Sequence, residues 1–163
     1  MKRFLLRLIV VALLITAAWQ VWPFLQSPEG QARKRHMSLF ETVSKRNWKA
    51  VPAYLAESYE DQWGQKGPEA VEVARELLAG FIILEIRWEP TEAGANDNIV
   101  KLRGHARMEG NGLGISQILM TKVNQLQEPW VFTWQKDGWH PSGWRLISIT
   151  NKELENVGLP ADF

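Results

Sequence analysis

The chain has 163 residues and a formal net charge of +1, from 19 basic and 18 acidic side chains, and it contains no cysteine. This length indicates one domain with short additions, and the balanced charge gives no global field that would attract nucleic acid. The absence of cysteine excludes disulfides, thiolate metal sites, cysteine nucleophiles and a lipidated cysteine.

The N-terminal stretch is the most apolar part of the sequence. No charged side chain occurs from Leu8 to Leu25, and this run is close to the roughly 20 residues that cross a bilayer. Trp19 and Trp22 lie at its far end, where indole rings favour the headgroup layer. We therefore predict a signal-anchor transmembrane helix over residues 1–25, in contact with the lipid bilayer through residues 4–25.

Two other interpretations of this stretch stay open. Thr16-Ala17-Ala18 is a weak match to a signal-peptide cleavage site, and the stretch would also suit a buried helix. The basic residues before the apolar run favour a cytoplasmic N-terminus, whereas the "RKRH" cluster at 33–36 opposes it. Because the preceding tail is short, we expect the domain in the periplasm, at the cell membrane. The cluster itself is either in contact with anionic headgroups or a solvated helix start.

After a polar linker over 26–36, the sequence shows helical periodicity. Met37, Phe40 and Val43 begin a domain that we place at 37–151. Asn47 resembles an N-cap for a second helix over 48–59, with a distortion expected at its proline. Its apolar stripe is formed by Trp48, Val51, Leu55 and Tyr59.

A third helix is predicted over 68–79, with a stripe of Val71, Ala74, Leu78 and Phe81.

The periodicity then changes from that of helices to that of strands. Five strands are predicted, at 82–89, 99–109, 115–126, 130–136 and 143–150. In the first, Ile82, Leu84, Ile86 and Trp88 share one face. In the second, the small residues Gly104 and Ala106 share the inward face, where the sheet bends or a helix comes close. The tail, 152–163, is expected to hold a short helical turn and then a frayed end.

Helices followed by antiparallel strands indicate an α+β domain. We therefore predict an N-terminal transmembrane helix followed by a cone-shaped domain of three helices packed on a curved antiparallel sheet.

Two segments resemble a known family. The segment "SLFETVSKRNWKAVPAYLAESYEDQW" is similar to the opening of nuclear-transport-factor-2-like (SnoaL-like) domains, and "KDGWHPSGWRLISIT" is similar to their last hairpin. The resemblance covers roughly 37–151. It implies a cone with a pocket between the helices and the sheet, where enzymes of the family place an acid/base residue and hydrogen-bond donors. The family includes isomerases, dehydratases, dimerisation modules and scaffolds, so the fold does not choose a function.

Few residues qualify as an acid/base pair. Asp61 lies where family enzymes carry a pocket acid, although its acidic neighbours also fit a solvated loop. His105 is a natural proton shuttle, but strand parity places it with basic residues on the outer or dimer face. Tyr59 is either a hydrogen-bond donor or a packing residue. We find no metal-ligand spacing and no cofactor motif, and expect neither group.

Tryptophan is abundant, with nine residues in the chain. Aromatic rings stacked across a hairpin can fix its register without any ligand. Some of them would otherwise present flat walls to a lipid, sugar or aromatic ligand, or meet a partner protein. The candidate ligand-binding residues are Tyr59, Trp63, Trp88, Trp130, Trp134 and Trp144.

Charges alternate on the outer face of the first two strands. Glu85, Arg87 and Glu89 lie across from Lys101, Arg103 and Arg107, which fits either a wet surface or a homodimer interface. The sequence therefore favours a membrane-anchored, non-catalytic domain that binds a small apolar ligand or an envelope partner protein. An isomerase- or dehydratase-type enzyme and a structural homodimer module are the alternatives.

Overall fold

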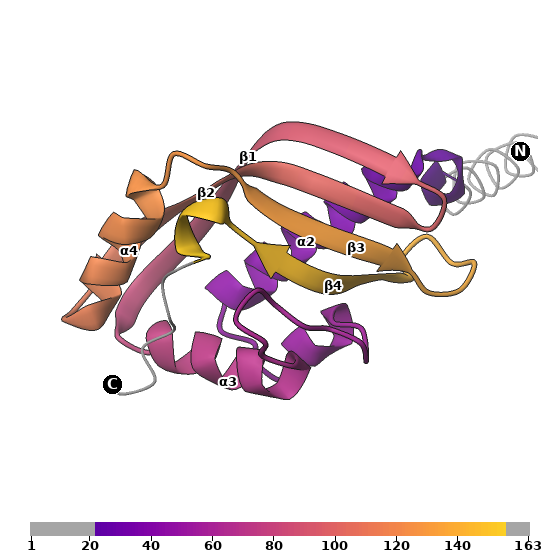
Figure 1. The fold of residues 1–163 in the computed structure, drawn as a ribbon. Helices are drawn as coiled ribbons and strands as arrows, with labels where there is room; N and C mark the ends of the chain where they lie inside the picture. The colour runs from indigo at the N-terminus through magenta and orange to yellow at the C-terminus, as the bar shows by residue number, and fades with distance from the viewer. Residues whose placement is uncertain (1–21, 156–163) are drawn as a thin grey trace, which may run out of the picture.

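Four antiparallel strands pair in the order β1-β2-β3-β4, so each strand lies beside its neighbour in sequence (Figure 1). They are β1 (Phe81–Asn96), β2 (Ile99–Gly112), β3 (Trp130–Lys136) and β4 (Trp144–Thr150). They belong to a computed structural model that describes residues 22–155. The predicted α+β class and antiparallel sheet are confirmed.

The sheet is strongly bent along β1 and β2 (Figure 1). Register shifts interrupt their pairing between Phe81 and Ile83 and between Pro90 and Glu92, and such bulges bend a strand. Gly104 pairs with Pro90 beside the second shift, so the small residue lies at the bend, as predicted. Ile82 was predicted to face inward with Leu84, Ile86 and Trp88, and this is wrong. The first register shift turns Ile82 outward, where it is 65% exposed, and Phe81 is buried in its place.

Helix α2 (Pro28–Ser44) begins earlier than the sequence analysis expects. Ser27 caps it by accepting a hydrogen bond at Oγ from the Gly30 amide, at 3.2 Å, and Pro28 suits the first helical position. Most of the range 26–36, predicted as a linker, is therefore helical. Its proline and glycine belong to a helix N-terminus. Ala32, His36, Leu39 and Phe40 are buried against the sheet.

The predicted helix over 48–59 is wrong. Its only helical element is the 3-10 turn η2 (Val51–Tyr54), after which the chain follows the free edge of β4 with a turn at 57–58. The Ala56 amide donates to the Leu146 carbonyl at 2.9 Å, and the Glu60 amide donates to the Ile147 carbonyl at 3.1 Å. Because β4 offers these backbone partners and Pro52 lacks an amide, pairing with the sheet replaces helical hydrogen bonds. Helix α3 (Gly67–Leu77) follows close to its predicted position.

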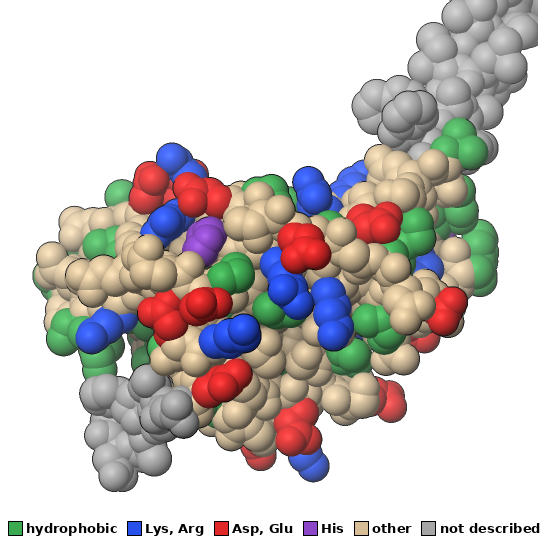
Figure 2. Space-filling view, turned by 45° about the horizontal axis from the view of Figure 1, so that its top comes forward, with side chains coloured by type: hydrophobic (Ala, Val, Ile, Leu, Met, Phe, Trp, Pro, Cys, Tyr) green, Lys and Arg blue, Asp and Glu red, His purple; other side chains and the backbone are tan. Residues whose placement is uncertain are grey.

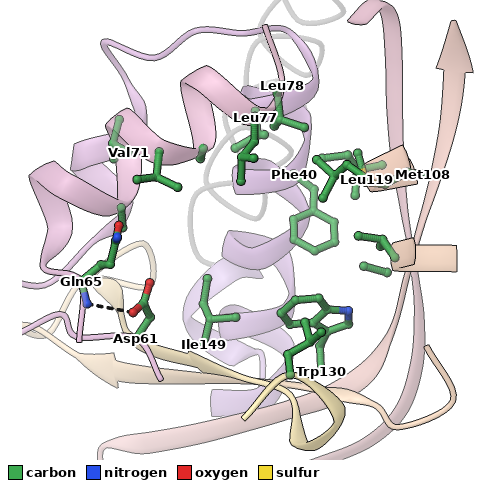
Figure 3. Close-up of a pocket in the computed structure, with 18 of the residues that line it drawn as sticks. Phe40, Asp61, Gln65, Val71, Leu77, Leu78, Met108, Leu119, Trp130 and Ile149 are labelled. Atoms are coloured by element: carbon green, nitrogen blue, oxygen red, sulfur yellow. Dashed lines mark hydrogen bonds between the residues drawn. The ribbon is translucent and has the colours of Figure 1, made fainter. Parts of the chain in front are cut away.

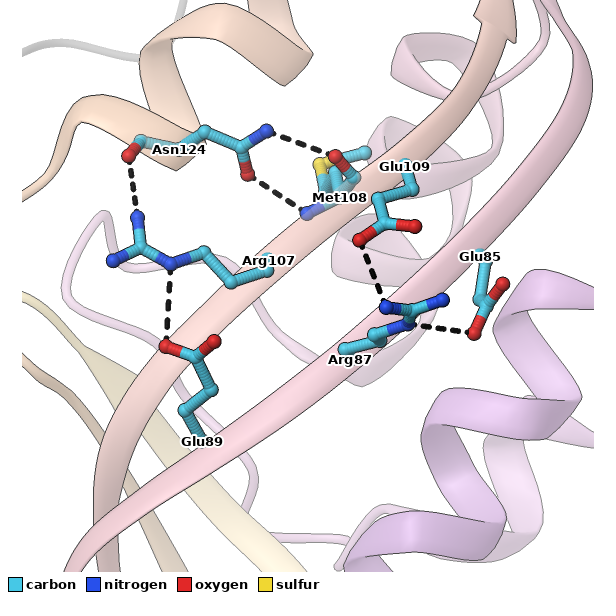
Figure 4. A network of polar contacts seen from close by, with 7 residues as sticks. All are labelled: Glu85, Arg87, Glu89, Arg107, Met108, Glu109 and Asn124. Carbon is cyan, nitrogen blue, oxygen red and sulfur yellow. Dashed lines mark hydrogen bonds and ion pairs between the residues drawn. The ribbon is translucent and has the colours of Figure 1, made fainter.

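The predicted strand over 115–126 is also wrong, because this segment is helix α4 (Ile115–Gln125). Asn124 attaches α4 to β2: its side chain accepts from the Met108 amide and donates to the Met108 carbonyl, both at 2.8 Å (Figure 4). The structure thus has three α-helices and four strands within residues 22–155, where three helices and five strands were predicted.

Most of the predicted signal anchor, residues 1–25, lies outside the described residues. Its end forms the 3-10 turn η1 (Trp22–Leu25). Within residues 22–155, no helix combines the length and the apolar character needed to cross a bilayer. At the other end, the helical turn predicted for the tail is present as η3 (Lys152–Leu154), and the tail beyond residue 155 also lies outside the description.

Candidate functional site

A cavity of about 950 Å³ lies between the helices and the concave side of the sheet. This volume is at the upper end of what small-molecule sites need. Its wall is predominantly apolar (Figure 3). Apolar lining residues come from α2 (Leu39, Phe40, Val43), α3 (Val71, Ala74, Leu77), the sheet (Ile86, Ala106, Met108, Trp130, Phe132, Leu146, Ile149) and α4 (Ile115, Ile118, Leu119, Val123).

Part of the cavity wall is formed by α4 and η3. Three of its lining residues there, Lys122, Gln125 and Glu153, are exposed. Their polar ends provide a wet rim around an apolar interior, which is the usual arrangement at the mouth of a ligand site.

Asp61 lines the cavity, but its carboxylate is engaged in the loop that carries it. Its Oδ1 accepts hydrogen bonds from the Trp63 amide at 3.0 Å and the Gln65 amide at 2.9 Å (Figure 3). These bonds fix the turn around Gly64, which has a φ of +77°. Asp61 therefore has a structural role that accounts for its position without any proton transfer.

Tyr59 also lines the cavity and is only 4% exposed. Burial raises the pKa of its hydroxyl, and the nearby Asp61 carboxylate adds to the shift. The phenol thus stays protonated at neutral pH and offers an O–H donor rather than a base.

Two further polar atoms of lining residues are buried without a hydrogen-bond partner among the described residues. They are Oε1 of Gln65, an acceptor, and Nε1 of Trp130, a donor. A buried polar atom without a partner costs roughly 1–3 kcal/mol, and both atoms lie behind the cavity wall rather than on its exposed surface.

The six predicted ligand-binding residues separate into two groups. Tyr59, Trp63 and Trp130 line the cavity. Trp88, Trp134 and Trp144 do not, because they are buried in the core between α2 and the sheet, at 9%, 0% and 2% exposure. Strand parity could not separate these groups, because neighbouring rings on one face of the sheet meet either α2 or the cavity.

His105 does not reach the cavity. It pairs with Glu89 across β1 and β2, on the face whose ion pairs join Arg87 to Glu85 and Glu109 and Arg107 to Glu89 (Figure 4). Figure 2 shows acidic and basic side chains interspersed on one face of the molecule. The structure therefore brings Asp61 and Tyr59 together but leaves His105 outside.

Sequence reasoning missed the contribution of α4 and a buried histidine. The α4 residues were hidden by the strand assignment, although their spacing of three and four residues was the available signal. His36 is 0% exposed, and its ring lies 4.4–4.5 Å, between centroids, from Phe40, Trp88 and Phe132. Neither ring nitrogen has a partner among the described residues. Burial lowers its pKa to about 3, and Arg33 contributes.

Comparison with known proteins identifies the fold only. No protein-family model matches the sequence, and no curated protein is similar to it. Among solved structures, Bd1075 of Bdellovibrio bacteriovorus is 8% identical with a TM-score of 0.54, over 74% of this chain and 38% of that one. This chain therefore spans well under half of Bd1075.

Two further structures match over most of their own length. The NTF2 chain Rd1NTF2_05, with five named substitutions, is 14% identical with a TM-score of 0.53, over 74% of this chain and 95% of that one. A candidate scytalone dehydratase from Novosphingobium aromaticivorans is 7% identical with a TM-score of 0.52, over 74% and 81%. At such identities the likeness establishes an NTF2-like fold, as the sequence resemblance predicted, and does not establish an activity.

Proposed function

We propose that this protein binds a small apolar ligand without catalysing a reaction, and that it does so at a membrane to which its N-terminal segment anchors it. One observation carries the binding proposal: a cavity of about 950 Å³ whose wall is predominantly apolar. Hydrophobic stabilisation is about 25 cal/mol per Å² of apolar surface removed from water. An apolar molecule that covers this wall therefore binds with a favourable free energy.

The polar atoms around the cavity describe the rest of the ligand. Tyr59 supplies a protonated hydroxyl, and the unpartnered Trp130 N–H and Gln65 carbonyl oxygen, which lie buried behind the wall, would pair with a ligand if their side chains turned toward the cavity. These groups suit a molecule with an apolar body and a polar group that both donates and accepts hydrogen bonds.

The membrane part of the proposal is supported by the sequence alone. The uncharged run from Leu8 to Leu25 has basic residues before it and tryptophans at its far end. Flotation of the full chain with lipid vesicles tests it. Extraction by alkaline carbonate, as for a peripheral protein, would contradict it.

An isomerase- or dehydratase-type enzyme is the second candidate, because Tyr59 and Asp61 line the same cavity. Asp61→Asn separates the two. An enzyme that uses this carboxylate as a base would lose turnover of its substrate by about 10²-fold or more. A binding domain would keep its ligand and lose only stability in the loop.

A homodimer through the outer sheet face remains a further proposal. Arg87 and Arg107 of that face are already paired with glutamates within one protomer, so a second copy would have to exchange these pairs. Native mass measurement over a concentration series checks it, and a monomer at high concentration would count against it.

The binding proposal is tested by native mass spectrometry of the purified full chain, in detergent, with extraction and identification of any bound small molecule. Ala74 lines the cavity on α3, whereas Ala79, just after the helix, is exposed and does not. Ala74→Trp should reduce ligand occupancy by about 10-fold or more, since it fills ligand space. The same change at Ala79 should leave occupancy unchanged. Equal occupancy in the two variants would show that the ligand lies elsewhere.

A further inference from the structure

Exposed aromatic side chains gather at one end of the domain, where the described chain begins. Phe24 and Leu25 of η1 are 43% and 74% exposed, and Trp139, in the connection between β3 and β4, is 80% exposed. The rings of Phe24 and Trp139 stack with centroids 5.6 Å apart, and His140 packs edge-on against both. We call these four residues the aromatic foot. It joins two segments that are distant in sequence.

The β3–β4 connection holds Trp139 in this position. The Asp137 amide donates to the Gly143 carbonyl at 2.6 Å, and the Gly143 amide donates to the His140 carbonyl at 2.8 Å. Lys136 Nζ donates to the same His140 carbonyl at 2.7 Å and to Oε1 of Gln31 on α2 at 3.0 Å. The connection is thus tied to itself and to α2, so the indole is presented outward by an ordered turn.

Such a patch suits the boundary between water and lipid. Tryptophan rings with a polar edge favour the headgroup layer of a membrane, and contiguous exposed apolar side chains mark interaction surfaces. The foot contains both a large indole and the half-polar ring of His140. This composition fits lipid headgroups better than a dry protein interface.

The chain around the foot points to lipid as the occupant. The uncharged run from Leu8 leads directly into η1, so the foot adjoins the most apolar segment of the sequence. The exposed bases Arg33 and Lys34 follow in the second turn of α2, about 8 Å along the helix axis from its start. Anionic headgroups attract basic side chains that lie this close to the membrane surface.

We propose that the aromatic foot inserts into the headgroup layer of an anionic membrane and fixes the orientation of the domain on it. This inference rests on the proposed membrane anchor, to whose end Phe24 and Leu25 belong, and adds a contact made by Trp139 and His140 of the folded domain. The foot lies at the opposite end of the sheet from the start of β1 (Figure 1). The domain would therefore contact the membrane at one end, with the start of β1 directed away from it.

The chain has no cysteine, so single cysteines can be labelled uniquely. An environment-sensitive fluorophore is placed at Asp137→Cys beside the foot, and in a matched protein at Glu76→Cys, exposed on α3 near the start of β1. Both full-length proteins are reconstituted in phosphatidylcholine–phosphatidylglycerol vesicles. At position 137 the emission should shift to the blue and be quenched by lipids spin-labelled near the headgroup. At position 76 it should do neither.

Second-site variants connect the signal to the foot. In the Asp137→Cys protein, Trp139→Ser should abolish the blue shift and the quenching, and Trp139→Phe should retain them. Ile82→Ser removes a side chain that is 65% exposed at the start of β1 and should have no effect. Flotation of the unlabelled chain is measured in parallel.

The outcomes separate the two proposals. A chain that does not float with the vesicles overturns the anchor and the foot together. A chain that floats with the same emission at 137 and 76 overturns the foot alone. A blue shift at 137 without quenching by lipid also overturns it, because the foot would then be covered by protein, either another part of this chain or a second copy.

Discussion

Gly104 has no room for a side chain. A Cβ atom there would lie 2.7 Å from Cζ2 of Trp88, and it would also meet the Glu89 carbonyl across the strand pair. Gly104→Ala should therefore lower the free energy of unfolding by about 1–3 kcal/mol. Gly94→Ala is the matched control on β1, because a Cβ there meets nothing within 4 Å. Denaturant unfolding of both variants checks this, and equal midpoints would show that Trp88 moves aside freely.

His36 makes the domain sensitive to acid. Its pKa is lowered from 6.5 to about 3 by burial among aromatic rings, so the unfolded state binds the proton more readily than the folded state. Stability is unaffected by this group above pH 6.5 and falls as the pH drops from there toward 3. One such group changes the free energy of unfolding by at most about 1.4 kcal/mol per pH unit.

The test compares the wild type with His36→Phe, which keeps an aromatic ring in the cage. Carboxylates contribute to acid unfolding in both proteins, so the difference between them isolates the histidine. Between pH 6.5 and 4 the variant should lose stability less steeply than the wild type. Parallel curves over this range would mean that the imidazole is protonated equally in both states.

The candidate acid and donor illustrate what a sequence can say about single residues. The family resemblance places Asp61 at the position of a pocket acid, and Tyr59 is a candidate hydrogen-bond donor from the apolar stripe; both line the cavity. The role of Asp61 was not readable, because its two hydrogen bonds depend on how the loop closes around Gly64. The burial of His36 was not predicted, because the domain's first helix was expected to begin after this residue.

At the level of elements, two side chains join α4 to β2: Arg107 donates to the Asn124 carbonyl, and the Asn124 side chain bonds the backbone of Met108 (Figure 4). β2 pairs with β3 only from Ile99 to Gly104, which leaves the edge of β2 near Met108 without a strand partner. The Asn124 amide satisfies both backbone groups of Met108 there. It thus closes an edge that would otherwise offer itself to another chain.

Asn124→Ala should lower stability by about 1–3 kcal/mol, since it leaves a backbone donor and acceptor unpaired. Hydrogen exchange of the Met108 amide should speed up selectively. Gln117→Ala, at an exposed position of the same helix, is the control. If both variants exchange alike at Met108, the side-chain bridge is not what protects this edge.

The elements that the sequence predicted well are those whose local pattern and tertiary partner agree. β2 and β3 alternate cleanly, and α3 begins with Gly-Pro-Glu, in which proline occupies an early helical position. The two elements that were predicted wrongly, at 48–59 and 115–126, are those whose conformation depends on tertiary contacts. The segment after Val51 pairs with β4 instead of closing a helix. The segment 115–125 carries apolar residues at both odd and even positions because it meets both the cavity and β2, which obscured its helical period.

At the scale of the whole molecule, the class, the antiparallel sheet and its bend followed from the sequence pattern, and the family resemblance implied a cavity, but the residues that line it were predicted only in part. A cavity depends on how far α3 and α4 stand from the sheet, and periodicity gives only the face that each element buries. The tryptophans show the consequence. All three of Trp88, Trp134 and Trp144 point inward as expected, yet they pack under α2, while Trp130 on the same sheet reaches the cavity.

The cavity also links ligand binding to the stability of the whole domain. A ligand that binds only the folded state adds RT ln(1 + [L]/Kd) to the free energy of unfolding, about 2.7 kcal/mol at a concentration 100 times Kd. Delipidation of the wild type should therefore lower its melting temperature, and addition of the identified ligand should restore it. Ala74→Trp should respond to neither treatment, because the indole occupies the ligand's space, whereas Ala79→Trp should respond as the wild type does. A stabilising effect of equal size in Ala74→Trp would place the ligand outside the cavity, and the binding proposal would fail even if the chain remained attached to the membrane.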